Sequence, residues 1–383
     1  MNIGTAPRVE KEGEGGKPMY ASPFSSTYAE AREKFLQAAT AAGARLWAYT
    51  HPRCGPDGEA LTTDCAWIGD PQARAVLILV SGTHGIEGYC GSGAQIDWLR
   101  RAEAARLGRD QAVLLVHGIN PYGFAWARRV THENVDLNRN FVDFSSPLPA
   151  NPEYARLAEA AKPLDWSKES QAAARKVLLD YARTNGFKAM AQVISGGQYT
   201  HPDGLFFGGS APTWSRLTLE AIFKEHLSSA SDIGLIDYHT GLGPEGYAEQ
   251  IISAAHGSEE YHRAVLWHGL AATSQTSGDS VSARLAGDWL DAAPGLLGHA
   301  RVTGIALEYG TVDSNRVLDA LRADNWLHAH GDVASELGRE IKQQIRDAFY
   351  VDTDIWRGMV LGQSLIATRQ SIAGLARALS QDA

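Results

Sequence analysis

The stretch AVLILVSGTHGIEG, residues 75–88, decides the class of fold. It begins as a continuous apolar run and changes at Gly82 into a glycine-rich turn. Such a run is typical of a strand buried on both faces of a parallel or mixed sheet. A segment with helical character follows over 93–108, and a second apolar run occupies 112–117. A strand, a helix and another strand in this order predict a β-α-β unit, and therefore an α/β architecture.

Further segments extend this pattern along the chain. Apolar runs predict two more buried strands, over 233–239 and 304–308, and an additional strand over 250–255. Residues 28–42 carry apolar positions at helical spacing and end at Gly43, which predicts a helix there. Helices are also predicted within 151–190 and through most of the chain after about residue 315.

The composition is that of an ordinary globular protein with a moderate negative charge. The 383 residues are 44% hydrophobic and 21% charged, and the formal net charge is −9. This charge, without any local run of Lys and Arg, argues against nucleic acid as a partner. Residues 1–20 are rich in Gly, Lys and Glu, which predicts a flexible tail. Because no internal repeat or linker divides the rest of the sequence, we predict a single domain over residues 21–383.

The cysteines and the apolar segments bear on the cofactor and the location. Cys54, Cys65 and Cys90 are odd in number and lack Cys-x-x-Cys spacing, which argues against a disulfide framework and against a thiolate zinc site. The first residues lack the apolar core of a signal peptide, and no segment reaches the roughly 18 apolar residues that a membrane helix needs. We therefore expect a cytoplasmic protein with no membrane partner.

Polar residues that could bind a metal ion or take part in catalysis stand at the carboxyl ends of the predicted strands. His84 and Glu87 follow the first strand, Asn120 follows the second, His239 closes the third, and Glu308 closes the fourth. Ligands of open α/β sheets bind at the carboxyl ends of the strands. We therefore expect these side chains to converge at one edge of the sheet.

Three of these residues form a plausible set of metal ligands. His84 and Glu87 are three residues apart, close enough to reach one ion from a turn, and His239 is the best third ligand. Two imidazoles and one carboxylate, with a fourth position open to water, are a known arrangement for catalytic zinc. The alternative for His84 taken alone is a hydrogen-bonded core histidine. We predict one zinc ion held by His84, Glu87 and His239.

A longer motif strengthens this interpretation. Residues 117–141 read HGINPYGFAWARRVTHENVDLNRNF, which resembles the signature of zinc carboxypeptidases of the carboxypeptidase A superfamily. SGTHGIEG and DYHTG are closer to its aspartoacylase and succinylglutamate desuccinylase branch. Together with GQYTHPDGLFFGG and ALEYGT, the combination resembles an uncharacterised bacterial branch, a domain of unknown function. The resemblance covers roughly residues 70 to 315 and implies a three-layer α/β/α fold with a mixed, mostly parallel, twisted central sheet.

The resemblance also implies roles for individual residues. Glu308 matches the general base and acid, which takes a proton from water and delivers it to the leaving amine. Arg129 matches the arginine that stabilises the developing oxyanion, and Arg128 is the alternative if the correspondence shifts by one residue. Asn138 and Arg139 match the pair that binds the terminal carboxylate of the substrate.

Other polar residues of these segments carry weaker indications. Asp136 is interpreted as a residue that supports a ligand or a turn. The superfamily often places a mobile tyrosine over the substrate, and Tyr199, Tyr247 and Tyr309 are the candidates, none with a convincing match. His201 could line the pocket, although a solvent-facing or hydrogen-bonding role is the simpler interpretation.

The predicted activity is that of a zinc metallohydrolase that cleaves an amide bond next to a free carboxylate, as a metallocarboxypeptidase does. Its substrate is then a small peptide or an N-acyl amino acid. An N-acyl amino acid amidohydrolase or deacylase is the first alternative, and a non-catalytic metal-binding or ligand-binding protein on the same fold is the second. The sequence contains no Gly-x-Ser-x-Gly motif, which argues against a serine hydrolase. Residues 241–246 match the dinucleotide-binding fingerprint, but Pro244 is incompatible with the helix start that this motif requires.

Overall fold

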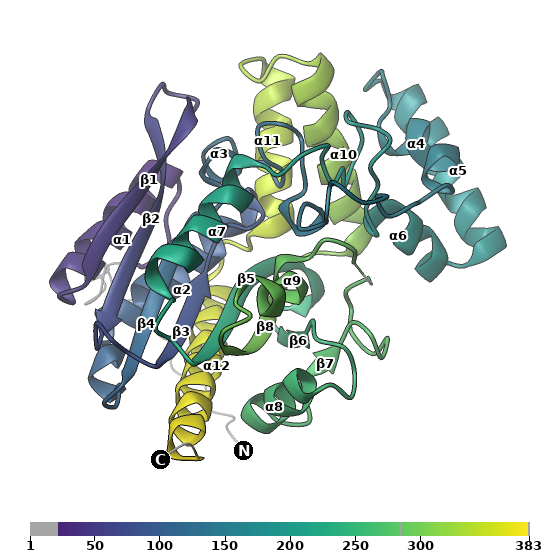
Figure 1. Cartoon of the computed structure of the whole chain (residues 1–383). Helices are drawn as coiled ribbons and strands as arrows, with labels where there is room; N and C mark the ends of the chain where they lie inside the picture. Colours follow the sequence, from purple (N-terminus) through teal and green to yellow (C-terminus); the bar gives the residue numbers. More distant parts are fainter. Residues whose placement is uncertain (1–21, 284, 382–383) are drawn as a thin grey trace, which may run out of the picture.

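The centre of the protein is an eight-stranded sheet (Figure 1). A computed structural model describes residues 22–283 and 285–381. Within them the strands lie in the order β1-β2-β4-β3-β5-β8-β6-β7. Their bounds are β1 Arg45–Cys54, β2 Ala60–Gly69, β3 Ala75–Val80, β4 Gln111–His117, β5 Asp232–Glu245, β6 Ala248–Ile252, β7 Thr273–Ser274 and β8 Arg301–Gly310. The predicted tail over residues 1–20 lies outside the described residues, so its separation from the domain stays a prediction.

The four central strands β4, β3, β5 and β8 are parallel to one another. Antiparallel neighbours flank them: β2 pairs with β4 on one side, and β6 pairs with β8 on the other. The residues of β3 are fully buried, as their apolar run predicts for a strand covered on both faces. The sheet is therefore mixed but mostly parallel at its centre, which confirms the predicted fold class.

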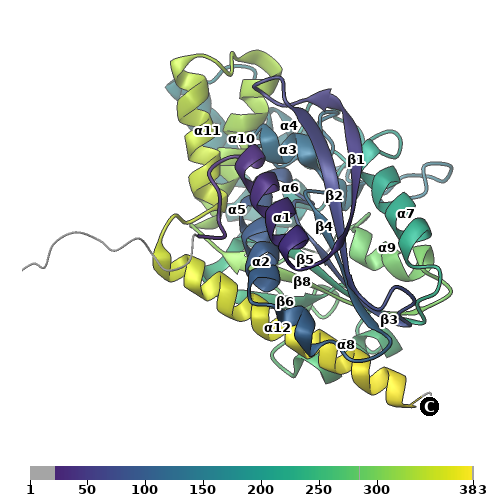
Figure 2. The same cartoon turned by 90° about the vertical axis from the view of Figure 1, so that its left-hand side faces the viewer.

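Helices cover both faces of the sheet, as Figure 2 shows. On one face the core contains residues of α1 (Tyr28–Ala41), α2 (Gly88–Arg100), α8 (Glu259–His268) and α12 (Asp354–Gln381). On the other face it contains residues of α7 (Trp214–His226) and α9 (Trp289–Leu296). These layers make the α/β/α arrangement that was predicted. No helix among the described residues is both long enough and apolar enough to cross a membrane.

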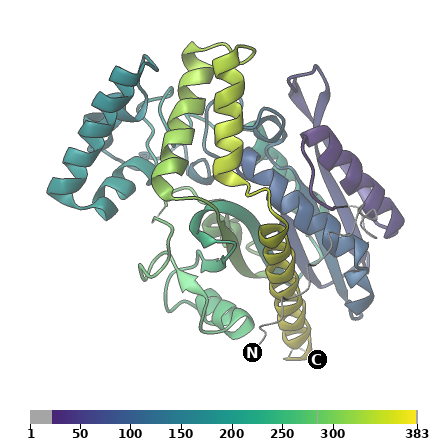
Figure 3. The same ribbon diagram turned by 180° about the vertical axis from the view of Figure 1, so that it is seen from behind.

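Two groups of helices extend beyond these layers (Figure 3). One is the pair α10 (Ser314–His330) and α11 (Glu336–Phe349). The other consists of α4 (Tyr154–Ala161), α5 (Lys168–Asn185) and α6 (Phe187–Ser195). The two groups are joined where Arg322 of α10 donates a hydrogen bond to the carbonyl of Ala160 at 2.9 Å. α11 also packs against β5 and the turn after β3, so this helix lies close to the carboxyl edge of the sheet.

The hairpin of β1 and β2 was not predicted from the sequence. Most of β1 is exposed or half-exposed, and β2 contains buried polar residues, so neither strand has a clear apolar pattern. Side chains of α1 satisfy these polar groups: Arg32 binds Asp64 with Nε–Oδ2 at 2.7 Å, and Tyr28 donates to the carbonyl of Thr62 at 2.8 Å. Burial here depends on tertiary hydrogen bonds that a local pattern does not contain.

The turn after β3 is built on glycine, as expected. Gly82 has a φ of +72°, in the left-handed region that favours glycine. A Cβ on Gly85 would lie 2.0 Å from the carbonyl carbon of Gly123 in α3 (Pro121–Ala125). The absence of a side chain at residue 85 therefore lets α3 contact the backbone of the 3₁₀ helix η1 (Gly85–Glu87) directly.

Hydrogen bonds of Gln95 connect α2 to the ends of two central strands. Its buried amide donates to the carbonyls of Leu79 and Val116 at 2.9 and 3.0 Å. Its oxygen accepts from the hydroxyl of Ser81 at 2.9 Å. The amide thus links α2 to β3 and β4 just before the loops that carry the polar residues.

We predict that Gln95→Leu lowers the free energy of unfolding by about 1–3 kcal/mol, because Ser81 loses its buried acceptor. Urea unfolding followed by circular dichroism measures this change. The control is Gln37→Leu on the exposed face of α1, which should change the free energy by less than about 0.5 kcal/mol. Equal effects of the two substitutions would contradict a special role for the buried amide.

Candidate metal centre

The parallel pairing of β3, β5 and β8 brings the predicted ligands together. Val80 at the end of β3 pairs with Asp237 of β5, and His239 of β5 pairs with Glu308 of β8. His84 caps the amino end of η1, and Glu87 is its last residue. The strand ends and the turn therefore place His84, Glu87, His239 and Glu308 in one buried region.

His84, Glu87 and His239 form a compact group. One ligand atom from each residue lies within 4.8 Å of the others. Nδ1 of His84 is 3.0 Å from Oε1 of Glu87, and Nδ1 of His239 is 2.8 Å from Oε2 of Glu87. All three side chains are buried, and Nδ1 of His84, although close to Glu87, makes no hydrogen bond of suitable geometry. The unpartnered nitrogen and the donor set of two imidazoles and a carboxylate fit a metal ion such as zinc.

A buried carboxylate stands behind each imidazole. Oδ1 of Asp136 is 3.2 Å from Nε2 of His84, and Oδ2 of Asp237 is 2.6 Å from Nε2 of His239. Asp237 is held in turn by the hydroxyl of Thr83 at 2.8 Å and the indole N–H of Trp289 at 2.7 Å. Carboxylates in this position orient the ring so that its other nitrogen faces the metal.

Asp237 was not selected from the sequence, although a signal was present. It lies two residues before His239 on β5, and side chains two residues apart point to the same face of a strand. Thr83 and Trp289 carried no comparable signal. Trp289 begins α9, and only the tertiary fold places its indole beside Asp237.

Opposing electrostatic effects act on the carboxylates of the centre. Burial raises the pKa of Glu87, but His84 and His239 outweigh burial and hold that pKa well below its usual range. Burial, and then the charge of Glu87, raise the pKa of Glu308 to about 8. The Glu308 carboxylate accepts one backbone hydrogen bond, from the N–H of Leu242 at 3.0 Å. Two carboxyl groups of one site thus differ strongly in their affinity for a proton.

Of the two adjacent arginines, Arg129 is the one that contacts the centre. Its Nη1 donates to Oε1 of Glu87 at 3.0 Å, and its Nε donates to Oδ2 of Asp136 at 2.9 Å. Its Nη2 lies 2.8 Å from Nε2 of His84. Arg128 turns away and pairs with Asp324 of α10 at 3.0 Å. Of the two arginines that the sequence offered, Arg129 therefore lies beside the candidate ligands, and its role in stabilising an oxyanion stays a prediction.

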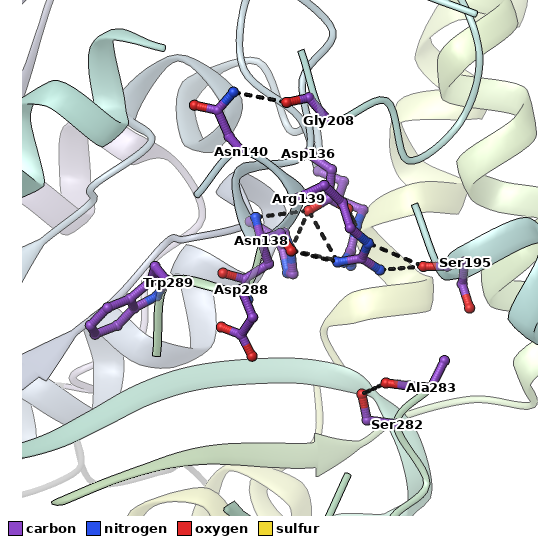
Figure 4. A network of polar contacts seen from close by, with 12 residues as sticks. Asp136, Asn138, Arg139, Asn140, Ser195, Gly208, Ser282, Ala283, Asp288 and Trp289 are labelled. Carbon is purple, nitrogen blue, oxygen red and sulfur yellow. Dashed lines mark hydrogen bonds and ion pairs between the residues drawn. The ribbon is translucent and has the colours of Figure 1, made fainter. Parts of the chain in front are cut away.

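Asn138 and Arg139 lie on the 3₁₀ helix η3 (Leu137–Arg139), and Figure 4 shows the Arg139 guanidinium directed toward Ser195. Nδ2 of Asn138 is 3.5 Å from Nε2 of His239, and its Oδ1 is buried without a partner. The Arg139 side chain is 2% exposed. It donates to the carbonyl of Asn138 at 3.1 Å and to the carbonyl of Ser195 through Nε at 3.2 Å and through Nη2.

Phe206 lies against both arginines. The guanidinium carbons of Arg129 and Arg139 are 5.2 and 5.5 Å from the centre of its ring, within the range of cation–π contacts. Phe206 has a φ of +54°, which is strained for a bulky side chain. The sequence marked this loop as rich in glycine and aromatic residues, but it did not single out Phe206.

The tyrosine candidates occupy different environments. Tyr309 is buried and donates to the carbonyl of Val360 at 3.1 Å, within the helix layer that contains α12, so it does not reach the centre. Tyr199 donates to the carbonyl of Arg139 at 2.6 Å. Tyr247 is 47% exposed in the turn between β5 and β6. Nδ1 of His201 lies 2.9 Å from the hydroxyl of Thr200, within its own loop.

The fold and the site define an α/β protein with a candidate His-Glu-His metal centre at the carboxyl edge of its sheet. The sequence matches the model of the family described as "Protein of unknown function (DUF2817)" over residues 24–363. The chain belongs to this family, which confirms the predicted membership of a family of unknown function. A search of curated proteins found no match in sequence.

Solved structures similar to this one include carboxypeptidase A from Helicoverpa armigera, with 11% identity and a TM-score of 0.43 over 84% of this chain and 74% of that chain. Succinylglutamate desuccinylase from Chromobacterium violaceum has 16% identity and a TM-score of 0.37 over 86% of this chain and 74% of that chain. An aspartoacylase family protein from Mesorhizobium loti has 15% identity and a TM-score of 0.35 over 76% of this chain and 68% of that chain.

We predict that Asp237→Asn weakens zinc binding by about 10- to 100-fold, because the amide no longer orients His239 as the carboxylate does. Competition with a chromophoric chelator measures the dissociation constant. Asp232→Asn is the matched control: Asp232 is buried at the opposite end of β5 and pairs with Arg301 at 2.7 Å. Unchanged zinc affinity in Asp237→Asn, or an equal loss in both variants, would show that Asp237 does not support the centre.

Proposed function

We propose that the protein is a zinc-dependent hydrolase that cleaves an amide bond next to a free carboxylate, in the manner of a metallocarboxypeptidase. The observation that carries this proposal is the buried group of His84, Glu87 and His239 with Glu308 paired beside His239. Zinc, when bound by these three residues, supplies Lewis acidity and lowers the pKa of coordinated water towards ~7.

Glu308 is the proposed general base and acid. Its Oε1 accepts the N–H of Leu242, and its Oε2 has no hydrogen-bond partner among residues 22–283 and 285–381. Oε2 is therefore the atom that would take a proton from water and pass it to the leaving nitrogen. Burial and the charge of Glu87 raise the pKa of Glu308, so the carboxyl retains a proton readily once it has taken one. The positive charge of a bound metal ion would lower this pKa and favour the ionised form that the first step needs.

Arg129 is the proposed donor to the developing oxyanion. Glu87 and Asp136 hold the guanidinium from two sides, and Phe206 lies against its carbon. A donor that is already oriented stabilises new negative charge without rearranging during the reaction. Its side chain is 15% exposed, compared with 1% for Glu87 and 0% for Asp136.

Asn138 and Arg139 are the proposed ligands of the substrate carboxylate. A guanidinium binds a carboxylate through two parallel hydrogen bonds, and Asn138 adds an amide close to His239. In the present arrangement Arg139 donates to Ser195 through two nitrogens. Binding a carboxylate in both positions therefore requires Arg139 to release the carbonyl of Ser195.

The same chemistry also serves an N-acyl amino acid amidohydrolase or deacylase. The segments SGTHGIEG and DYHTG favour this second candidate through their resemblance to the aspartoacylase branch. The substrate is then a small N-acyl amino acid in place of a peptide. A protein that only binds metal or ligand has no use for a proton carrier at Glu308, so we place that alternative last.

We predict that Glu308→Gln retains one zinc ion per chain and loses turnover by about 10²- to 10⁴-fold, because the amide cannot carry the proton. Elemental analysis measures the metal, and release of free amino acid from peptide and N-acyl amino acid libraries measures turnover.

The control for this prediction is Glu249→Gln, which removes the buried carboxylate of the residue that pairs with Glu308 on the adjacent strand β6. Glu249 accepts from Thr273 and from the N–H of Val281, away from the ligands. Wild-type turnover in Glu308→Gln would remove its role as the base, and an equal loss in Glu249→Gln would point to a general effect of charge.

We also predict that amidation of the substrate carboxylate lowers kcat/KM by at least about 100-fold in the native protein, because a charge-assisted bidentate pair is lost. In Arg139→Lys the difference between the free acid and the amide should shrink, since an ammonium cannot form the bidentate pair. Equal kcat/KM for the free acid and the amide in the native protein would argue against recognition of a carboxylate.

A further inference from the structure

A buried ionic cluster lies directly behind Arg129 and is not used in the proposed reaction. It consists of Arg128, Asp324 and His328 of α10, and Lys342 of α11, and we call it the α10–α11 cluster. Nε of Arg128 donates to Oδ2 of Asp324 at 3.0 Å, and Nζ of Lys342 donates to Oδ1 of the same carboxylate. Nε2 of His328 lies 2.7 Å from Nζ of Lys342.

Asp324 is the only carboxylate that contacts this cluster among the described residues. Its side chain is 5% exposed and that of Arg128 is 6% exposed, so solvent screens their interaction little. Burial, followed by the charges of Arg128 and Lys342, lowers the pKa of His328 to about 3, although Asp324 acts against them. The neutral imidazole can therefore accept a hydrogen bond from Lys342, and Asp324 is left to balance the charges of both cations.

Through Arg128, the cluster is bonded to residues 127–134, a segment with unusual backbone geometry. Ala127 and Asn134 have φ values of +47° and +63°, and non-glycine residues seldom adopt such values. Asn134 accepts from Nη2 of Arg128 at 3.2 Å and donates to the carbonyls of Pro202 and Gly204 at 3.0 and 3.2 Å. The surroundings thus hold the segment in a conformation that its own preferences disfavour.

The same segment supports the turn that carries two of the candidate ligands. The N–H of Gly85 donates to the carbonyl of Arg129 at 3.0 Å, and the N–H of Ile86 donates to the carbonyl of Arg128 at 2.8 Å. Arg128 and Arg129 are adjacent, yet their side chains enter different regions, one towards Asp324 and the other towards Glu87. Fixing Arg128 therefore fixes the backbone from which Arg129 projects.

We propose that Asp324 is a positioning residue, which acts through Arg128 to direct Arg129 into the candidate metal centre and to hold the backbone that supports His84 and Glu87. The part of this inference that concerns Arg129 in turnover rests on the proposed function. The part that concerns the backbone of residues 84–87 does not. α10 and α11 contribute none of the candidate ligands. α11 packs against η1 and β5, and the ionic cluster adds a charged link from both helices to Arg128.

Hydrogen–deuterium exchange of the full-length chain tests the backbone part. We expect Asp324→Asn to speed exchange about tenfold or more in peptides that cover 84–88 and 127–134, because the amides of Gly85 and Ile86 lose fixed acceptors. Asp319→Asn is the matched control, since Asp319 lies on α10 but pairs with Arg322 at 3.0 Å and with Arg175. It should leave exchange in these peptides unchanged.

A second variant keeps the test decisive if Asp324→Asn does not fold. Arg128→Lys retains the charge but loses the fork that reaches both Asp324 and Asn134. It should speed exchange in the same two peptides. Exchange at the native rate in every folded variant of this pair overturns the inference, whatever the protein catalyses.

A double-mutant cycle on the zinc-loaded protein tests the part that concerns Arg129. We expect Asp324→Asn to lower kcat about tenfold or more with KM changed less than about threefold, and to have little further effect in an Arg129→Lys background. Equal losses in both backgrounds overturn the link to Arg129. Faster exchange in a protein without hydrolase activity would count against the proposed function but would support the backbone role of Asp324.

Discussion

The burial of the Glu87 carboxylate is the constraint around which the centre is organised. A carboxylate that is 1% exposed is stable only beside compensating charge or hydrogen-bond donors, and the Nδ1 atoms of His84 and His239 lie at its two oxygens. Each imidazole is held from behind by another buried carboxylate, Asp136 for the first and Asp237 for the second. Buried carboxylates and imidazoles therefore alternate outward from Glu87, and each group lies within hydrogen-bonding distance of the next.

The residues on strands and those on loops are held in position by different contacts. His239 and Glu308 are placed by the register of β5 and β8, which main-chain hydrogen bonds determine. His84 and Glu87 lie on a turn without such a ladder, and the carbonyls of Arg128 and Arg129 take over its role. The loop that carries two of the candidate ligands is thus held by main-chain hydrogen bonds to a second loop, and this second loop is linked through Arg128 to α10 and α11.

The sequence predicted the parts of the protein that depend on local pattern. Apolar runs located the central strands, and polar residues at their ends placed His84 and His239 in one region. The choice between Arg128 and Arg129 could not be made in this way, because it depends on Asp324, far away along the chain. The β1–β2 hairpin was missed for a related reason: its buried polar residues are satisfied by side chains of α1. Features that depend on long-range hydrogen bonds and ion pairs cannot be predicted from the local periodicity of the sequence.

The close approach of η1 and α3 has a consequence for sequence variation within the family. A Cβ on Gly85 would lie 2.0 Å from the backbone of Gly123, and a Cβ on Gly123 would lie 2.5 Å from Nδ2 of Asn120 and 2.7 Å from the carbonyl of Val130. A side chain at residue 85 would therefore separate η1 from α3, whereas a side chain at residue 123 would displace the Asn120 side chain and the backbone around Val130. Replacement of either glycine needs its own compensating change: a wider spacing of η1 and α3 for residue 85, and a shifted segment 128–130 for residue 123. Each of the two glycines thus constrains a different neighbouring backbone.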